Sequence, residues 1–261
     1  MARDIGQAVR EACLCLPESE EFLSHGSPNF RVRGKTFATY TVNHHGDGRV
    51  ALWLNAPPGS QELHVRAEPE YFFVPAYVGR RGWLGVILNS SIAWTRVVAL
   101  IREAYEKAAP KELLRTLGKT PAIKAAKALT PVEIDPFKSA RAAAVLKRLR
   151  EICLRFPETS EGRQFGHPVW IAGKKTFVMA RHDGAMMLCF WVGVEAQSML
   201  TADPRFSIPP YIGHNGWIGL NVGRHCDWQE VAALCEQSYR HFALKRMLAS
   251  MPNSNAPSTP D

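Results

Sequence analysis

The sequence contains Pro75-Ala76-Tyr77-Val78-Gly79-Arg80-Arg81-Gly82-Trp83-Leu84-Gly85 and repeats it, 134 positions later, as Pro209-Pro210-Tyr211-Ile212-Gly213-His214-Asn215-Gly216-Trp217-Ile218-Gly219. Self-similarity at a fixed spacing is the signature of a repeated structural unit. The sequence therefore predicts that its 261 residues hold two copies of one domain.

A second set of matches lies near the start of each copy, at an offset of 140. Residues 13–18 read Cys-Leu-Cys-Leu-Pro-Glu and residues 153–158 read Cys-Leu-Arg-Phe-Pro-Glu. Lys35-Thr36-Phe37 likewise recurs as Lys175-Thr176-Phe177. The offset falls between the two sets because the second copy is shorter in its middle, and loops between structural elements tolerate such deletions.

Hydrophobic periodicity places the same elements in the same order in both copies. The first copy predicts an opening helix that ends at Pro17, strands at 30–32, 35–42 and 50–54, a helix at 61–67, strands at 72–78 and 83–88, and a helix at 92–108. The second predicts an opening helix that ends at Pro157, strands at 169–172, 175–181 and 186–192, a helix at 195–201, two more strands as in the first copy, and a last helix from its cap Asp227 to about Met247. This order favours an α+β fold, in which each copy is a two-layer domain with an antiparallel sheet and helices on one face.

The predicted domain boundaries follow from composition. The copies span residues 1–109 and 139–251. The connecting residues 110–138 hold six Lys and Arg against three acidic residues, and their prolines interrupt any long helix, so we expect a basic linker there. Residues 252–261 are rich in Pro, Ser and Asn, which predicts a disordered tail.

The landmarks together resemble the MmcQ/YjbR-like family. They are Leu-Pro-Glu after the first helix, His-Pro before a strand, Lys-x-Phe in the next strand, and Pro-x-Tyr-x-Gly-x-x-Gly-Trp-x-Gly before a helix that contains Trp. The second copy carries His167-Pro168, whereas the first reads His25-Gly26-Ser27-Pro28 and departs from the pattern. The resemblance implies an α+β fold similar to CyaY-like and secretion-chaperone-like domains. It also implies DNA binding, which has been described for this fold, and it supplies no catalytic residue and no cofactor.

Composition narrows the class of partner and the compartment. The chain has 32 Lys and Arg against 24 Asp and Glu, a net charge of +8 and a sequence pI near 9.3, which favours an anionic partner such as DNA. No stretch approaches the roughly 18 consecutive apolar residues that span a bilayer, and the polar N-terminus does not match a secretory signal, so we expect a cytoplasmic protein without a membrane partner. The six cysteines form no Cys-x-x-Cys pair and are expected to be reduced thiols, most of them buried.

The candidate DNA-binding residues are polar or cationic positions on predicted hairpin tips and outward strand faces. Arg80 and Arg81 occupy the tip between the last two strands of the first copy, where a pair of guanidinium groups can bind phosphates or a guanine edge. A solvated turn is the alternative interpretation. The full set is Arg31, Arg33, Lys35, Arg80 and Arg81 in the first copy, and Lys174, Lys175, Arg181, His214 and Asn215 in the second.

A different class of function is a small-ligand or protein-binding module that uses an aromatic-lined sheet face. His167, Tyr211 and Trp217 would then lie at the mouth of its site. At strand positions the aromatic residues Tyr77, Trp83, Tyr211 and Trp217 are also typical of core.

Catalysis and metal binding have less support. The repeated glycines lie between two predicted strands, whereas a dinucleotide loop joins a strand to a helix. His44, His45 and Asp47, or His182 and Asp183, crowd into turns without the spacing of a metal motif. The sequence therefore predicts a non-enzymatic protein without a metal or cofactor.

Overall fold

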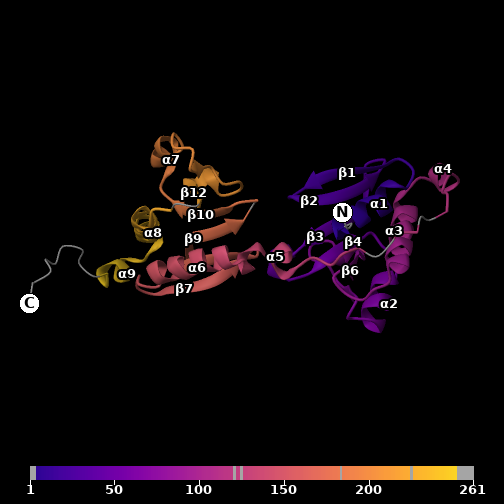
Figure 1. The fold of residues 1–261 in the computed structure, drawn as a ribbon, viewed down its shortest axis with the longest axis horizontal. Coiled ribbons are helices and arrows are strands. Elements are labelled where there is room, and N and C mark those ends of the chain that lie inside the picture. The colour runs from indigo at the N-terminus through magenta and orange to yellow at the C-terminus, as the bar shows by residue number, and fades with distance from the viewer. Residues whose placement is uncertain (1–3, 120–121, 124–125, 183, 224–225, 252–261) are drawn as a thin grey trace, which may run out of the picture. The chain divides into compact units, whose positions relative to one another are not determined.

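The computed structural model describes residues 4–119, 122–123, 126–182, 184–223 and 226–251. The chain divides into two compact units, residues 1–135 and 136–261, here called the first and the second domain (Figure 1). Each contains one six-stranded sheet in which all neighbouring strands are antiparallel. The predicted α+β fold in two copies is confirmed.

The first domain has strand order β1-β2-β3-β4-β6-β5. Its strands are β1 (Ser19–Ser24), β2 (Ser27–Val32), β3 (Lys35–Val42), β4 (Val50–Leu54), β5 (Phe72–Phe73) and β6 (Leu84–Ile87). Its helices are α1 (Ile5–Leu14), α2 (Ser60–Ala67), α3 (Trp94–Ala108), α4 (Lys111–Leu114) and α5 (Pro131–Ile134). Single turns of 3-10 helix span His44–Gly46 and Gly79–Arg81.

The second domain repeats this arrangement with strand order β11-β12-β10-β9-β8-β7. Its strands are β7 (Thr159–Gln164), β8 (His167–Ala172), β9 (Lys175–His182), β10 (Met186–Trp191), β11 (Phe206–Ser207) and β12 (Trp217–Asn221). Its helices are α6 (Ala140–Cys153), α7 (Val194–Leu200), α8 (Trp228–Phe242) and α9 (Lys245–Ala249), and 3-10 turns span Pro136–Lys138 and Gly213–Asn215.

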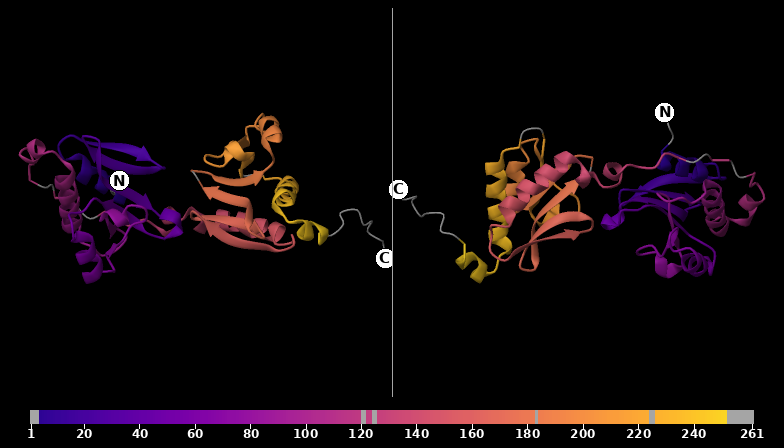
Figure 2. Two further views of the ribbon diagram at one scale, coloured as in Figure 1. Left: turned by 180° about the vertical axis from the view of Figure 1, so that it is seen from behind. Right: turned by 60° about the horizontal axis from the view of Figure 1, so that its bottom comes forward.

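The main core of each domain lies between one face of the sheet and the two long helices, which Figure 2 shows from two further directions. In the first domain α1 and α3 pack on β3, and Tyr105 of α3 is fully buried with its hydroxyl donating to the Pro17 carbonyl at 2.8 Å. Tyr239 of α8 does the same in the second domain, donating to the Pro157 carbonyl at 2.7 Å. Burial of apolar surface stabilises each core, and these hydroxyls fix the end of the first helix against the last.

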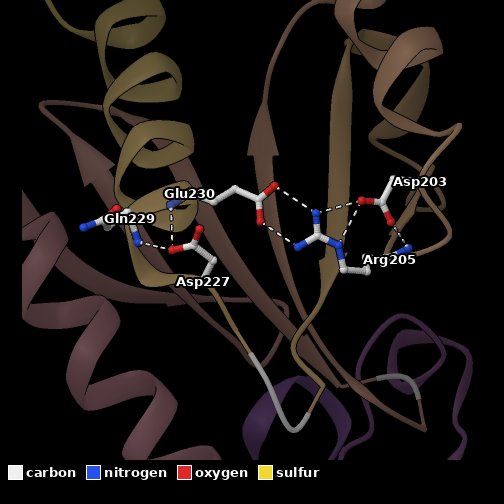
Figure 3. A network of polar contacts seen from close by, with 5 residues as sticks. All are labelled: Asp203, Arg205, Asp227, Gln229 and Glu230. Atoms are coloured by element: carbon white, nitrogen blue, oxygen red, sulfur yellow. Dashed lines mark hydrogen bonds and ion pairs between the residues drawn. The ribbon is translucent and has the colours of Figure 1, made fainter.

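Helix α8 begins where the sequence predicts, but it ends at Phe242, and the residues up to Met247 belong in part to a separate helix, α9. The Asp227 carboxylate accepts hydrogen bonds from the backbone N–H groups of Gln229 and Glu230 (Figure 3). This satisfies donors that the first helical turn leaves unpaired.

Each sheet contains one strand more than the sequence predicts. Strands β1 and β7 form the outer edge of each sheet and pair along their whole length with β2 and β8. Their sequences, Ser-Glu-Glu-Phe-Leu-Ser and Thr-Ser-Glu-Gly-Arg-Gln, are polar and lack regular alternation. An edge strand that is half exposed gains its stability from the ladder of hydrogen bonds, so hydrophobic periodicity does not reveal it.

The predicted hairpin around the repeated glycines is wrong in its first strand. β5 ends at Phe73, and the chain then leaves the sheet through Pro75 and reaches the 3-10 turn Gly79–Arg81 before β6 begins. Arg80 and Arg81 therefore lie on a turn of helix. Gly82 and Gly216, which follow the two 3-10 turns, have φ of 79° and 83°, a conformation that glycine adopts without strain.

Much of the predicted linker packs on the first domain. The contacts divide the chain after Asp135, and Leu113 and Ile123 are buried in the first core. The predicted tail, 252–261, lies outside the described residues. All six cysteines are free thiols; four are buried, whereas Cys226 is half-buried and Cys15 is exposed. Among the described helices none is both long enough and apolar enough to cross a bilayer.

Candidate nucleic-acid interface

A glutamine side chain holds the repeated 3-10 turn in each domain. The amide nitrogen of Gln61, in α2, donates to the carbonyls of Gly79 and Trp83 at 2.8 and 2.5 Å. Gln197, in α7, donates to the carbonyls of Gly213 and Trp217 at 2.8 and 2.6 Å. Each turn is thereby tied at both ends to the helix beside it, which fixes the side chains that the turn presents.

The tyrosine before each turn is exposed and has a left-handed backbone. Tyr77 has φ 61° and is 71% exposed, and Tyr211 has φ 70° and is 73% exposed. Such a conformation is costly for a bulky residue, and strained positions of this kind cluster at functional sites. The expectation of a core position is thus wrong for both tyrosines, while it is confirmed for Trp83 and Trp217, which are buried.

Tyr77 lies against two histidines from the turn between β3 and β4. Its ring centroid is 6.0 Å from that of His44 and 5.8 Å from that of His45, and its hydroxyl lies 3.4 Å from His45 Nε2. His44 also packs its ring edge-on against Trp53, with centroids 4.8 Å apart. Burial, with a smaller effect of neighbouring His45, lowers the pKa of His44 below its ordinary value.

Metal ligands do not gather in the described part of the chain. No group of three or more His, Cys, Asp or Glu side chains there could hold a metal ion. Of the alternative pair in the second domain, Asp183 lies outside the described residues. His182 instead contacts the ring of Phe137, with centroids 6.1 Å apart.

Three of the predicted cations lie on segments at one end of the first sheet. Lys35 begins β3 beside Thr36, and Arg80 and Arg81 lie on the 3-10 turn; Thr36 and Arg81 line one cavity, which places these two segments side by side. All three cations are exposed, and none has an ion pair within the described residues. Lys35, Arg80 and Arg81 are called the cationic end below.

The other two predicted cations of the first copy form ion pairs with glutamates in, or directly before, the edge strand β1. Arg31 donates to Glu20 of β1 at 2.7 Å and lies over the ring of Phe22. Arg33 forms a two-pronged contact with Glu18, and this hydrogen bonding lowers the pKa of the Glu18 carboxyl. Both face outward as predicted, but their charge is already paired.

The second domain places its predicted residues differently. Lys174 and Lys175 are exposed at the turn between β8 and β9, and His214 and Asn215 are exposed on the 3-10 turn. Arg181 is only 8% exposed, so its prediction as a surface cation is wrong. Its guanidinium donates to the Pro210 carbonyl at 3.3 Å, which ties β9 to the segment that carries Tyr211.

The alternative ligand site is not assembled as predicted. Trp217 begins β12 and His167 begins β8, and the sheet order places β10 and β9 between these strands. Tyr211 lies near Trp217 in the chain, but its ring is exposed. The three side chains therefore do not line one common site.

A cavity that sequence analysis missed opens on the sheet face of the first domain that α1 and α3 leave uncovered. It has a volume of about 520 Å³ and contains no carboxylate among its lining residues. They are Asn29, Thr36, Thr39, Asn55, Val78, Arg81 and Trp83. Its Asn and Thr residues come from β2, β3 and the residue after β4, so only strand pairing brings them together, and no local sequence pattern signals the cavity.

The same face of the second domain is filled with apolar side chains. Asn29 pairs with Thr39 across β2 and β3, and the corresponding pair across β8 and β9 is Val169 with Met179. Val169 and Met179 are buried in an apolar cluster that Trp191 also contacts. The two domains thus share a fold but differ in the chemistry of this face.

A larger cavity of the second domain, about 890 Å³, is lined by three arginines, of which Arg205 forms ion pairs with two carboxylates. Arg205 is held between Asp203, at 2.7 Å, and Glu230, at 2.8 Å (Figure 3). In the first domain Arg96, which occupies the position of Glu230, pairs with Glu68. Both domains therefore have an ion pair between a long helix and a loop, but the helix carries the cation in the first domain and the carboxylate in the second.

Comparison with known proteins agrees with this duplicated fold. The family model described as YjbR matches the chain twice, at residues 14–107 and 154–241. Among solved structures, the chain is similar to the Deinococcus radiodurans protein DR2400, described with the family-model domain DUF419, at 19% identity and a TM-score of 0.37, over 44% of this chain and 88% of that one. No curated protein matches. Because the two matches to the family model cover more than half of its residues, the chain belongs to the YjbR family, with two copies of the domain in tandem.

Proposed function

We propose that the protein binds DNA, mainly through the phosphate backbone, and that the first domain makes the stronger contact. The observation that carries the proposal is the cationic end, where Lys35, Arg80 and Arg81 lie exposed at one end of the sheet without a carboxylate partner among the described residues. Unpaired guanidinium groups bind phosphate oxygens with two parallel hydrogen bonds, and an unpaired lysine adds a point charge.

An exposed tyrosine beside these cations supports the same function. Tyr77 is two residues before the 3-10 turn and presents most of its surface to solvent. Aromatic rings next to basic side chains are typical of proteins that bind nucleic acid, because bases stack on the ring while cations contact the backbone. The strained backbone at Tyr77 and Tyr211 indicates that this exposure is maintained in both domains.

The second domain is expected to contribute less. His214 and Asn215 replace the arginine pair, so the turn keeps hydrogen-bonding capacity but loses charge. Lys174 and Lys175 remain exposed for phosphate contact. Two sites on one chain would still increase the overall affinity if a single duplex reaches both.

The test is DNA binding by the full chain in which Arg80→Ala and Arg81→Ala are combined. Fluorescence anisotropy with a labelled duplex at low salt should show a larger loss of affinity than in His214→Ala. The matched control is Arg33→Ala, which removes an exposed arginine that Glu18 already pairs. Failure of the unmodified protein to bind any duplex at low salt would overturn the proposal, as would equal effects of all three changes.

A further inference from the structure

We propose that the cavity of the first domain binds one nucleoside monophosphate unit, either as a free nucleotide or as an unstacked nucleotide of a DNA strand. The second source rests on the proposed DNA binding, whereas the first does not. The cavity is open to solvent, and its volume of about 520 Å³ lies within the range of small-ligand pockets.

The phosphate would lie at Arg81. This side chain lines the cavity, is exposed and has no ion pair in the described part of the chain, so its fork of donors is available. The lining residues include no carboxylate that would repel an anion. Arg80, its neighbour in the same 3-10 turn, is exposed as well but does not line the cavity.

The base would accept hydrogen bonds from the Asn55 side-chain amide, which Lys107 orients. Lys107 of α3 donates to Asn55 Oδ1 at 2.8 Å and to the Ala56 carbonyl at 2.7 Å. Because a lysine ammonium can only donate, it fixes which end of the Asn55 amide faces it and leaves the Nδ2 donors for the cavity. Lys107 is thus a positioning residue, and both of its acceptors are neutral, so its positive charge also favours an anionic ligand.

The neighbouring strands β2 and β3 offer oxygen acceptors and an unused hydroxyl. The Thr39 hydroxyl donates to Asn29 Oδ1 at 2.6 Å, and Asn29 Nδ2 donates to the Ser27 carbonyl at 2.9 Å. This leaves lone pairs of Thr39 Oγ1 as acceptors. The Thr36 hydroxyl has no hydrogen bond among the described residues.

Val78 and Trp83 add an apolar wall to this polar cavity. A donor, an acceptor and a flat apolar surface are what the edge and the face of a nucleobase require.

The second domain serves as an internal comparison, because its equivalent face cannot hold the same ligand. Val169 and Met179 stand where the first domain has Asn29 and Thr39. The position of Asn55 is taken by Trp191. Asn55 lies two residues after Trp53, which pairs with Thr39. Trp191 likewise lies two residues after Cys189, which pairs with Met179. The polar groups are lost and their space is occupied, so only one nucleotide should bind per chain.

The first experiment compares two arginines of one turn. Isothermal titration of the full chain with each of the four deoxynucleoside monophosphates should give a stoichiometry of one. Arg81→Ala should weaken this binding by about 10- to 100-fold, as expected for a lost charged hydrogen bond, while Arg80→Ala leaves it within about twofold. Nucleosides without the phosphate should bind weakly to all three proteins. Equal effects of the two changes, or no binding of any monophosphate, would overturn the proposal.

The second experiment fills the cavity as the second domain does. Thr39→Met combined with Asn55→Trp should abolish monophosphate binding and should remove any preference for single-stranded over duplex DNA, while duplex binding by the cationic end persists. A melting curve checks that this variant folds; if it does not, the comparison of exposed Arg81 with Arg80 still decides. Competition of free monophosphate with a single-stranded oligonucleotide distinguishes the two sources of the ligand.

The results separate this inference from the proposed function. Binding of monophosphate that depends on Arg81, without binding of any DNA, would support the cavity as a nucleotide site and refute the proposed DNA binding. Salt-dependent duplex binding with no monophosphate binding and no preference for single strands would support the proposed function and refute the nucleotide site.

Discussion

The salt dependence of DNA binding gives the sharpest test of the cationic end. Each phosphate contact by Lys or Arg lowers the slope of log Kobs against log salt by about 0.9, because it releases a condensed counterion. Removal of Arg80 and Arg81 should therefore make the slope less steep by about 1.8, whatever the remaining cations contribute. Over a fourfold rise in salt, from about 50 to about 200 mM, the advantage of the unmodified protein should shrink by about 12-fold.

The assay is fluorescence anisotropy with a labelled duplex at several salt concentrations, for the unmodified chain, the double variant and Arg33→Ala. We expect Arg33→Ala to leave the slope nearly unchanged, because Glu18 already neutralises that guanidinium. An unchanged slope in the double variant would show that Arg80 and Arg81 do not contact phosphates. A similar change in Arg33→Ala would show that the ion pair opens on binding and that the structure does not identify the contact residues.

Three further predictions concern the first domain. Gln61→Ala should destabilise it by about 1–3 kcal/mol in denaturant unfolding, since the Trp83 carbonyl loses its side-chain donor and the Gly79 carbonyl keeps only the N–H of Gly82. It should also weaken ligand binding as the turn loosens, and unchanged stability would contradict the role of this side chain. Tyr105→Phe should cost about 1 kcal/mol by leaving the Pro17 carbonyl without its donor, and a neutral effect would show that water replaces it. The lowered pKa of His44 means that the unfolded chain takes up its proton more readily, so its contribution to stability is present above the ordinary histidine pKa of about 6.5 and is lost as pH falls below it. His44→Phe should reduce that loss in urea melts at successive pH values, and an identical pH profile would refute the assignment.

Much of the fold follows from patterns that are local in sequence. The two offsets predict the duplication. The bounds of β3 and β4 agree with the prediction because β3 is only partly buried, whereas β4 is a short, continuous apolar run that is buried throughout. The edge strand β1 could not be predicted this way, since its residues are half exposed and its stability comes from pairing with β2. Its absence from the prediction also hid the partners of Arg31 and Arg33, because Glu20 lies in β1 and Glu18 directly precedes it.

The candidate site was predicted only in part. Arg80 and Arg81 stood out as a charged pair between glycines, and the structure places both on an exposed 3-10 turn, with Arg81 lining a cavity that has no acidic lining residue. The rest of the lining could not be inferred from local patterns. Asn29, Thr39 and Asn55 come from different strands, and only the strand register brings them to one face.

The sequence by itself determined that the protein consists of two related α+β domains and that each has a glycine-bounded turn before its last strand. These features depend on side-chain periodicity and on glycine's access to positive φ, both of which are local properties. Tertiary structure alone decided which cations remain unpaired. It also decided that the uncovered sheet face carries a polar cavity beside an apolar cluster in the first domain and only an apolar cluster at the equivalent positions of the second. Charge pairing and cavity shape depend on atoms from strands far apart in the chain, so two copies with the same pattern can differ in what they bind.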